Sequence, residues 1–166
     1  MLLSSYHNYA FIGLGSNLSS QIGSPKDNVL KAIEYLKKLS DEPVQISTLL
    51  TSKPLDCPPG SPDFINAVLA LLPRQHETAL DFLQHLQQIE SSIGRTRSGV
   101  KNEARIIDLD LLIYRDEVCS TEKLVLPHPE LLFRSFVLEP LQEILDQEEF
   151  TRLKKFAKKN SARERS

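Results

Sequence analysis

Two aspartates, Asp108 and Asp110, stand one residue apart in the otherwise apolar run RIIDLDLLIY at residues 105–114. This run is rich in aliphatic and β-branched residues and predicts a β-strand. Side chains alternate between the faces of a strand, so both carboxylates share one face, with Cα atoms roughly 6.5 Å apart. A hard cation would offset their repulsion, and Mg²⁺ is commonly held by one or two carboxylates together with substrate phosphates. Taken alone, the pair favours the simpler interpretation, an edge strand that has one solvated polar face.

A basic segment, RTRSGVKNEAR at residues 95–105, leads directly into this strand. Its low apolar content predicts a loop, and the simplest interpretation is a solvated charged surface. Its position favours a second interpretation, because arginines grip phosphate oxygens with two parallel hydrogen bonds. Arginines beside two carboxylates and a divalent cation fit a polyphosphate. The sequence has no Gly-x-x-x-x-Gly-Lys-Ser/Thr motif, so the P-loop class is excluded.

Hydrophobic periodicity predicts the elements that position these residues. Helix 25–40 begins with the capping residues Ser24 and Asp27, and Gly94 is placed to end helix 77–93. The predicted strands are 9–15, 44–52, 64–72 and 105–114, with a short strand at 118–120 and a last helix at 133–145. The order β-α-β-β-α-β is typical of an α+β, ferredoxin-like sandwich, an antiparallel sheet with helices packed on it and extra C-terminal helices. In that layout we expect the first and fourth strands to form the central pair.

The whole chain has the composition of one soluble globular domain: 166 residues, 40% hydrophobic, 25% charged and a net charge of −2. This balance disfavours a nucleic-acid-coating protein. The sequence has no apolar run long enough to span a membrane and no signal peptide, and its two cysteines lack metal-ligand spacing, which indicates a cytoplasmic protein with reduced thiols. We divide it into a leader (1–8), a main domain (9–146) and a charged tail (147–166) that is a frayed helix or a linker.

Three function classes fit these residues. Metal-assisted attack on a nucleoside triphosphate could serve a small kinase that acts on a planar acceptor. It could also serve a polymerase or cyclase palm, which places paired carboxylates on a similar sheet. A binding module without catalysis is the third class, and it would not need Asp108 and Asp110 together.

Five motifs then occur in a recognisable order and spacing. They are GLGSN (13–17), PL (54–55) followed by PDFINA (62–67), IE (89–90) with GRTR (94–97), R-x-x-DLDLL (105–112), and PHP (127–129) with R-x-F-x-L-x-PL (134–141). Together they resemble the 6-hydroxymethyl-7,8-dihydropterin pyrophosphokinase family of folate biosynthesis, over about residues 9–144. The resemblance implies transfer of diphosphate from ATP to the hydroxymethyl group of the pterin, release of AMP, and two Mg²⁺ ions. Enzymes of that family are sometimes fused to other folate-pathway enzymes, so the resemblance allows a fused or neighbouring folate-pathway enzyme as a partner of this chain.

The resemblance also implies residue roles. Asp108 and Asp110 would bind both metal ions and, with Arg95 and Arg105, form the catalytic set. The residues implied to contact ATP are Gln87, Glu90, Arg97, Leu111, Lys123, His128 and Arg134. The residues implied to hold the pterin are Gly15, Ser52, Leu55, Phe64, Asn66 and Phe136. A flat heterocycle can be sandwiched between two aromatic rings, and an asparagine amide can both donate to its edge and accept from it.

One segment departs from the family pattern. Many relatives carry an aromatic-Gly-Pro-Arg run before the aspartates, whereas this chain has Asn102-Glu103-Ala104-Arg105. The aromatic residue that closes over the site is therefore absent, and Glu103 adds a negative charge near the phosphates. We expect closure to be weaker or to use other residues. Phe64 stands where many relatives have tyrosine, which keeps the ring and loses the hydroxyl.

Overall fold

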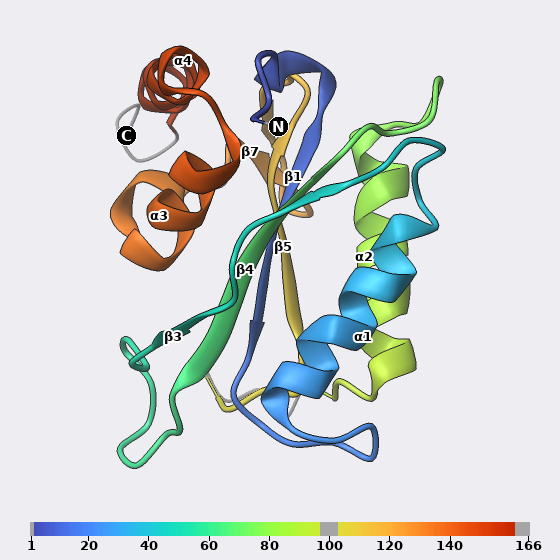
Figure 1. Ribbon diagram of the computed structural model, residues 1–166, viewed down its shortest axis with the longest axis vertical. Helices are drawn as coiled ribbons and strands as arrows, with labels where there is room; N and C mark the ends of the chain where they lie inside the picture. The colour runs from blue at the N-terminus through green and yellow to red at the C-terminus, as the bar shows by residue number, and fades with distance from the viewer. Residues whose placement is uncertain (1, 97–102, 162–166) are drawn as a thin grey trace.

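The computed structural model describes residues 2–96 and 103–161. Its centre is an antiparallel sheet with helices on both faces (Figure 1). The strands of this sheet are β1 (Ala10–Ser16), β2 (Gln45–Ile46), β3 (Leu50–Ser52), β4 (Phe64–Leu71) and β5 (Asp108–Tyr114). Strands β6 (Cys119–Ser120) and β7 (Val125–Leu126) form a small separate sheet. The helices are α1 (Pro25–Lys37), α2 (Ala79–Ile93), α3 (Ser135–Ile144) and α4 (Gln147–Lys159), with 3-10 turns η1 (Tyr6–Asn8) and η2 (Leu131–Phe133). The predicted α+β class is confirmed.

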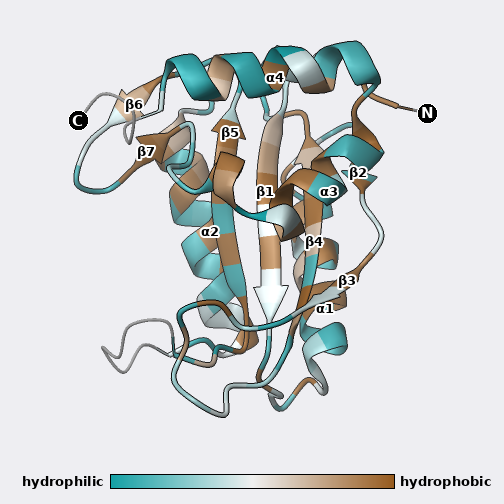
Figure 2. Ribbon diagram, turned by 90° about the vertical axis from the view of Figure 1, so that its left-hand side faces the viewer, coloured by the Kyte–Doolittle hydropathy of each residue, from teal (hydrophilic) through white to brown (hydrophobic). Residues whose placement is uncertain are grey.

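Each face of the sheet has its own hydrophobic core. Helices α1 and α2 cover one face, where Ile12 and Leu14 of β1 are buried. Helices α3 and α4 cover part of the other face, where Phe11, the residue just before Ile12, is buried. Figure 2 looks onto this second face and shows the hydrophobic centre of the sheet extending below α3, beyond the cover of the helices.

Predicted helix ends are confirmed where capping residues were present. The Ser24 and Asp27 side chains form a reciprocal capping box at the start of α1. Gly94 ends α2 with a φ of 112°, a left-handed conformation that glycine adopts without steric cost. Gly94 thereby turns the chain from α2 toward Arg95.

The strand order is β2-β4-β1-β5, with β3 pairing to β4. The prediction that the first and fourth strands form the central pair is therefore wrong for the fourth. Strand β1 is central, because β4 pairs along one of its edges and β5 along the other. Strand β5 is an edge strand of this sheet among the described residues. It has the sequence of an interior strand because helix layers cover both of its faces, with Leu111 buried on one and Leu112 on the other.

The predicted strand 44–52 is divided into β2 and β3. Ser47 lies between them and is buried, and its hydroxyl accepts a hydrogen bond from the Val68 amide (2.9 Å) while its own amide donates to the Val68 carbonyl (3.0 Å). A side chain thus replaces a strand partner, which regular alternation of apolar residues cannot reveal.

The ends of the described chain pack together. Leu3 forms an isolated parallel bridge with Leu145, and the Tyr6 amide donates to the Glu149 carboxylate (3.1 Å). The prediction of a frayed helix or linker from residue 147 is wrong for α4, because Phe150, Leu153 and Ala157 form a buried apolar stripe. Their spacing of three and four residues is helical, but the surrounding charges obscure it in the sequence. No helix in the described ranges is long and apolar enough to cross a membrane.

Candidate active site

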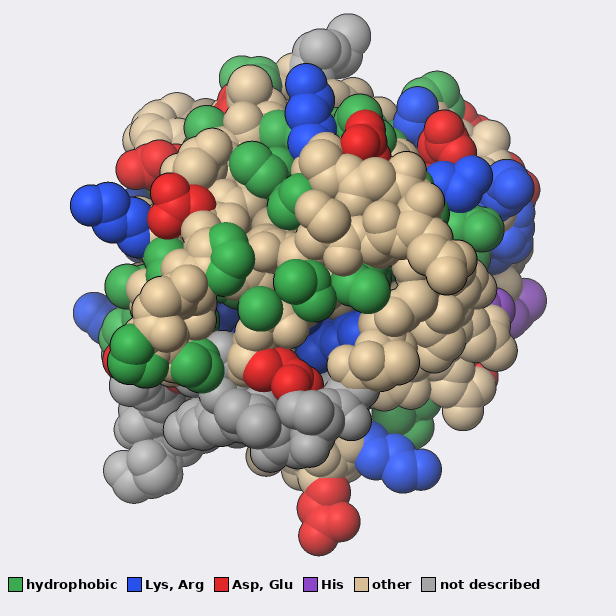
Figure 3. Space-filling view, turned by 90° about the horizontal axis from the view of Figure 1, so that it is seen from below, with side chains coloured by type: hydrophobic (Ala, Val, Ile, Leu, Met, Phe, Trp, Pro, Cys, Tyr) green, Lys and Arg blue, Asp and Glu red, His purple; other side chains and the backbone are tan. Residues whose placement is uncertain are grey.

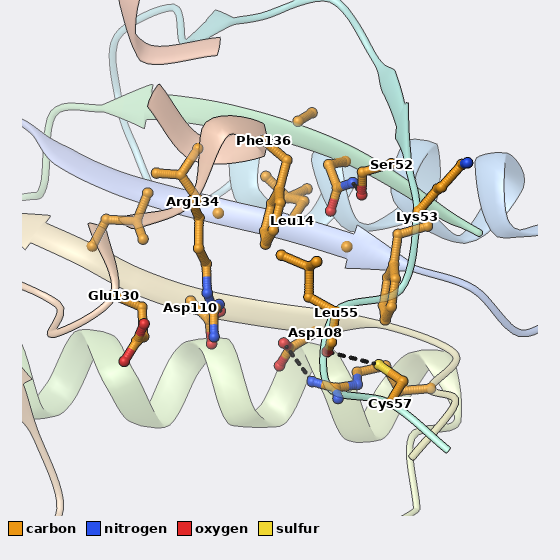
Figure 4. A pocket seen from close by; sticks show the side chains of 18 of the residues that line it. Leu14, Ser52, Lys53, Leu55, Cys57, Asp108, Asp110, Glu130, Arg134 and Phe136 are labelled. Atoms are coloured by element: carbon orange, nitrogen blue, oxygen red, sulfur yellow. Dashed lines mark hydrogen bonds and ion pairs between the residues drawn. The ribbon is translucent and has the colours of Figure 1, made fainter. Parts of the chain in front are cut away.

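A cavity of about 440 Å³ lies on the face of the sheet that α3 partly covers. Strand β1 forms its floor, and the 53–57 segment and α3 form its sides (Figure 4). Leu55 and Phe136 point into it from opposite sides, whereas the Lys53 ammonium points away. All six residues that the resemblance assigns to the pterin line this cavity: Gly15, Ser52, Leu55, Phe64, Asn66 and Phe136.

Strand register brings distant residues together at the floor. Gly15 lies opposite Asn66 on β4 and opposite Asp108 on β5, and Gly13 lies opposite Asp110. The two glycines leave this face without side chains, which creates the space of the cavity. A Cβ atom at Gly15 would lie 3.2 Å from Oδ1 of Asn66, so a larger residue would displace that amide. Asn66 is only 5% exposed, and its Nδ2 donates to the Ser52 hydroxyl at 2.5 Å.

A second cavity of about 260 Å³ lies around the edge of the sheet, between α2 and the 123–129 segment. Five of the residues that the resemblance assigns to ATP line it: Gln87, Glu90, Leu111, Lys123 and His128. Asp108 and Asp110 line both cavities. The two carboxylates therefore stand at the boundary between the space on the sheet face and the space at its edge.

Arginines surround the two carboxylates. Arg95 contacts Oδ1 of Asp108 at 2.7 Å, and Arg105 contacts Oδ2 at 3.0 Å. Arg134 lies 3.9 Å from the Asp110 carboxylate, and the two side chains point toward each other in Figure 4. Seen from the loop end of the molecule, basic side chains are recessed in a hollow (Figure 3). Arg97 lies outside the described residues.

Two of these arginines also face aromatic rings of the cavity. The Arg105 guanidinium lies 5.6 Å from the centre of the Phe64 ring, and that of Arg134 lies 5.5 Å from the centre of the Phe136 ring. Cation–π contact is favourable at such distances. Each arginine thus links a carboxylate of the boundary to a ring of the cavity on the sheet face.

Glu90 is only 5% exposed, so its side chain is buried and does not lie on a solvated face of α2. Its Oε2 accepts hydrogen bonds from Arg95 (2.5 Å) and from the Leu109 amide (2.9 Å). Burial raises the pKa of Glu90, and the two hydrogen bonds oppose that rise. Glu90 therefore orients the Arg95 guanidinium through this hydrogen bond. It also lines the second cavity.

The environment of the aspartates favours a bound cation. Burial and the nearby Asp108 carboxylate together raise the pKa of Asp110 to about 7. The described residues contain no cluster of three or more His, Cys, Asp or Glu side chains suited to a metal. A hard divalent cation would fit Asp108 and Asp110 if phosphate and water oxygens completed its coordination, which is how Mg²⁺ is commonly bound.

His128 is an uncharged donor in the second cavity. Burial lowers the pKa of His128 to about 4, and the Arg134 charge contributes to the decrease. Its Nδ1 accepts a hydrogen bond from the Glu130 amide at 3.1 Å, so the remaining proton is assigned to Nε2. The ring can thus donate one hydrogen bond to a ligand at neutral pH.

Several residues of the site were not predicted from the sequence. Gly13, Cys57, Glu130 and Phe133 line the first cavity. The spacing of Gly13 and Gly15 by two residues in a strand was a usable signal, because such glycines share a face. No local pattern indicated Cys57, Glu130 or Phe133, which reach the cavity from irregular segments.

This arrangement defines a class of protein: a ferredoxin-like α+β domain whose acidic pair and arginines join two ligand-sized cavities. The sequence profile of the 7,8-dihydro-6-hydroxymethylpterin-pyrophosphokinase family matches residues 11–146, which is most of the chain. The chain belongs to this family.

Individual relatives agree with the profile. A Haemophilus influenzae protein named 2-amino-4-hydroxy-6-hydroxymethyldihydropteridine pyrophosphokinase is 38% identical over 136 residues, covering 81% of this chain and 80% of its own. A Bacillus subtilis protein of the same name is 33% identical over 144 residues, covering 86% and 81%. The folic acid synthesis protein fol1 of Pneumocystis carinii is 37% identical over 134 residues, which are 81% of this chain and 17% of that longer protein.

Proposed function

We propose that the protein transfers the β,γ-diphosphate of ATP to the hydroxymethyl group of 6-hydroxymethyl-7,8-dihydropterin, releasing AMP. The observation that carries the proposal is the position of Asp108 and Asp110, which line both cavities. In a transfer between two substrates, the reacting groups must meet where the two cavities adjoin, because the transferred group passes from one cavity to the other. The names of the relatives support the same reaction.

The cavity on the sheet face suits the acceptor. A planar pterin fits between the rings of Phe64 and Phe136, and Leu55 adds apolar contact. Asn66 offers an amide to the heterocycle edge, and its bond to Ser52 fixes the orientation of that amide. The hydroxymethyl group would then point across β1 toward Asp108, which lies opposite Gly15 on β5.

The cavity at the sheet edge suits the nucleotide. Gln87, Lys123 and His128 supply polar contacts, and Leu111 supplies an apolar one. Arg95, Arg105 and Arg134 would exchange their contacts with the aspartates for contacts with phosphate oxygens. We include Arg97 in this phosphate-binding group on the basis of its motif alone.

The proposed chemistry forms one bond and breaks one. The hydroxymethyl oxygen of the pterin bonds to the β-phosphorus of ATP and loses its proton, and the bond from the β-phosphorus to the oxygen bridging it to the α-phosphorus breaks. That oxygen leaves with AMP. Asp108 and Asp110 would hold Mg²⁺, two ions by the resemblance, which when bound neutralises phosphate charge. The arginines stabilise charge on the leaving and transferred phosphates, and positioning by the two cavities provides much of the acceleration.

The test is product analysis with ATP, Mg²⁺ and the hydroxymethyl-dihydropterin. We expect AMP and the pterin diphosphate in equal amounts, and none when a chelator removes Mg²⁺. Asp110→Asn should lower the rate at least about 100-fold, because one carboxylate cannot hold the cations in place. Asp116→Asn is the matched control, since Asp116 is exposed just beyond β5 and outside both cavities.

Other products would identify the competing classes. Inorganic pyrophosphate with a nucleoside monophosphate attached to the product would indicate a palm-type enzyme, and ADP would exclude diphosphate transfer. No turnover, with Asp108→Ala unchanged in ligand binding, would indicate a binding module. We also propose the cytoplasm as the site of action, where ATP is available and Cys57 and Cys119 stay reduced.

A further inference from the structure

Asn17 connects two segments that each carry a residue of the site. It follows β1 directly and is 2% exposed. Its amide N–H donates to the Arg105 carbonyl (3.1 Å), and its Oδ1 accepts from the Arg105 amide (2.8 Å). Its Nδ2 donates to the Pro62 carbonyl (3.1 Å). One buried side chain thus bonds to segments that lie 88 and 45 residues further along the chain.

Both partners of Asn17 lead directly to the site. Arg105 extends its guanidinium to Asp108 at 3.0 Å. Pro62 lies two residues before Phe64, the first residue of β4 and part of the acceptor cavity. The two segments meet again where the Arg105 guanidinium lies over the Phe64 ring. The Asn17 amide therefore adds a direct connection between the segment that carries Arg105 and the segment that leads to Phe64, besides the pairing of β4 and β5 with β1.

Only an amide of this length satisfies both partners. The Arg105 N–H is a donor and the Pro62 carbonyl is an acceptor, so the side chain must offer one acceptor and one donor. These fixed partners also define which atom of the Asn17 amide is oxygen. An aspartate would place an acceptor against the Pro62 carbonyl, and an alanine would leave both backbone groups without this partner.

We propose that Asn17 is a positioning residue, which sets the distance between the phosphate-binding Arg105 and the pterin-binding Phe64 without contacting either substrate. The inference rests on the proposed function. Asn17 lines neither cavity, so its loss should change the chemical step more than the binding of each substrate. Misplacement of reacting groups by about 1 Å can lower a rate by about 100-fold.

The test combines hydrogen exchange at the Arg105 amide with single-turnover kinetics. In Asn17→Ala we expect the Arg105 amide to exchange at least about ten-fold faster and the single-turnover rate to fall at least about 30-fold. The dissociation constants of ATP and of the pterin, the latter with a non-hydrolysable ATP analogue, should change less than about three-fold. In Asn17→Asp the Arg105 amide should stay protected, while the rate falls at least about ten-fold because the Pro62 bond is lost.

Ser47→Ala is the structural control, because it removes a buried hydroxyl that bonds to two backbone groups outside both cavities. It should lower the melting temperature and leave the single-turnover rate within about two-fold. Unchanged hydrogen exchange of the Arg105 amide in Asn17→Ala would show that the Asn17 side chain does not hold Arg105. An unchanged single-turnover rate would refute the positioning role of Asn17. If Asn17→Ala does not fold, the rate of the isosteric Asn17→Asp decides. Wild-type protein that makes no AMP would overturn the proposed function instead. Hydrogen exchange of the Arg105 amide would then still test whether Asn17 holds Arg105.

Discussion

The amide of Leu109 donates a hydrogen bond to the Glu90 carboxylate at 2.9 Å. Leu109 is the residue between the two aspartates, and the same carboxylate oxygen accepts a hydrogen bond from Arg95. A side chain of α2 therefore holds the acidic part of β5 and the first arginine of the site at one point. Burial raises the pKa of Glu90, so these two contacts offset a desolvation cost.

Glu90→Ala should lower the free energy of unfolding by about 1–3 kcal/mol, because the buried Leu109 amide loses its acceptor. Glu90→Gln keeps an oxygen acceptor and should cost less than about 1 kcal/mol. Urea denaturation at pH 7.5 measures both. Glu148→Ala is the control, since Glu148 is exposed and its ion pair with Arg152 should contribute less than about 1 kcal/mol. Equal losses in Glu90→Ala and Glu90→Gln would contradict a role for the Leu109 hydrogen bond.

His128 should make the stability of the protein depend on pH. Its pKa is lowered to about 4 by burial, whereas an unfolded histidine titrates near about 6.5. Between these values the unfolded chain binds a proton that the folded chain does not, so acidification favours unfolding. From pH 7 to pH 5 this group should lower the free energy of unfolding by about 2 kcal/mol.

Urea denaturation at both pH values checks this prediction. His128→Gln should lose about 2 kcal/mol less stability on acidification than the wild type. His7→Gln, which changes an exposed histidine, should behave as the wild type does. An identical pH dependence in His128→Gln and the wild type would refute the assignment.

Cys57 lines the acceptor cavity, and its thiol donates to the Leu55 carbonyl at 3.2 Å. We expect the pterin to shield this thiol. In Cys119→Ser, which leaves Cys57 as the only thiol, the pterin at ten times its dissociation constant should slow alkylation by N-ethylmaleimide about ten-fold. A non-hydrolysable ATP analogue added alone is the control and should slow the alkylation less than about two-fold. Alkylation at the same rate with and without the pterin would place the heterocycle elsewhere.

Helix α4 should contribute to the stability of the fold. Leu153 is fully buried in the core between α3, α4 and the sheet. Leu153→Ala should lower the free energy of unfolding by about 2–5 kcal/mol through lost burial and a residual cavity. Lys155→Ala on the exposed side of the same helix should change it by less than about 0.5 kcal/mol. A loss of under about 1 kcal/mol in Leu153→Ala would mean that α4 is frayed in solution.

Local signals in the sequence were sufficient to predict the order of the helices and strands along the chain. Apolar runs identified the long strands, and the Ser24 cap and Gly94 gave helix ends that the structure confirms. The stripe of α4 was missed because charged residues surround Phe150 and Leu153. The edge position of β5 was missed because pairing is decided by β4, which occupies the other side of β1.

The site could be predicted only in part for a similar reason. The Asp-x-Asp pair was visible because alternation within one strand is local. The row formed by Asn66, Gly15 and Asp108 depends on the register of three strands, which no local pattern encodes, and only the motif resemblance suggested it. Asn17 was visible as the last residue of the GLGSN motif, but its partners at Pro62 and Arg105 depend on how two loops fold back.

The edge position of β5 has a consequence for aggregation. An exposed strand edge offers unpaired amides and carbonyls to which a strand of another molecule can add. Here the outward Leu109 amide is bonded to Glu90, and the Leu112 carbonyl accepts a hydrogen bond from the His128 amide at 2.9 Å. Both contacts come from residues that line the cavity at the sheet edge. The walls of this cavity therefore also protect the sheet from edge-to-edge association, so the site and the solubility of the fold depend on the same residues.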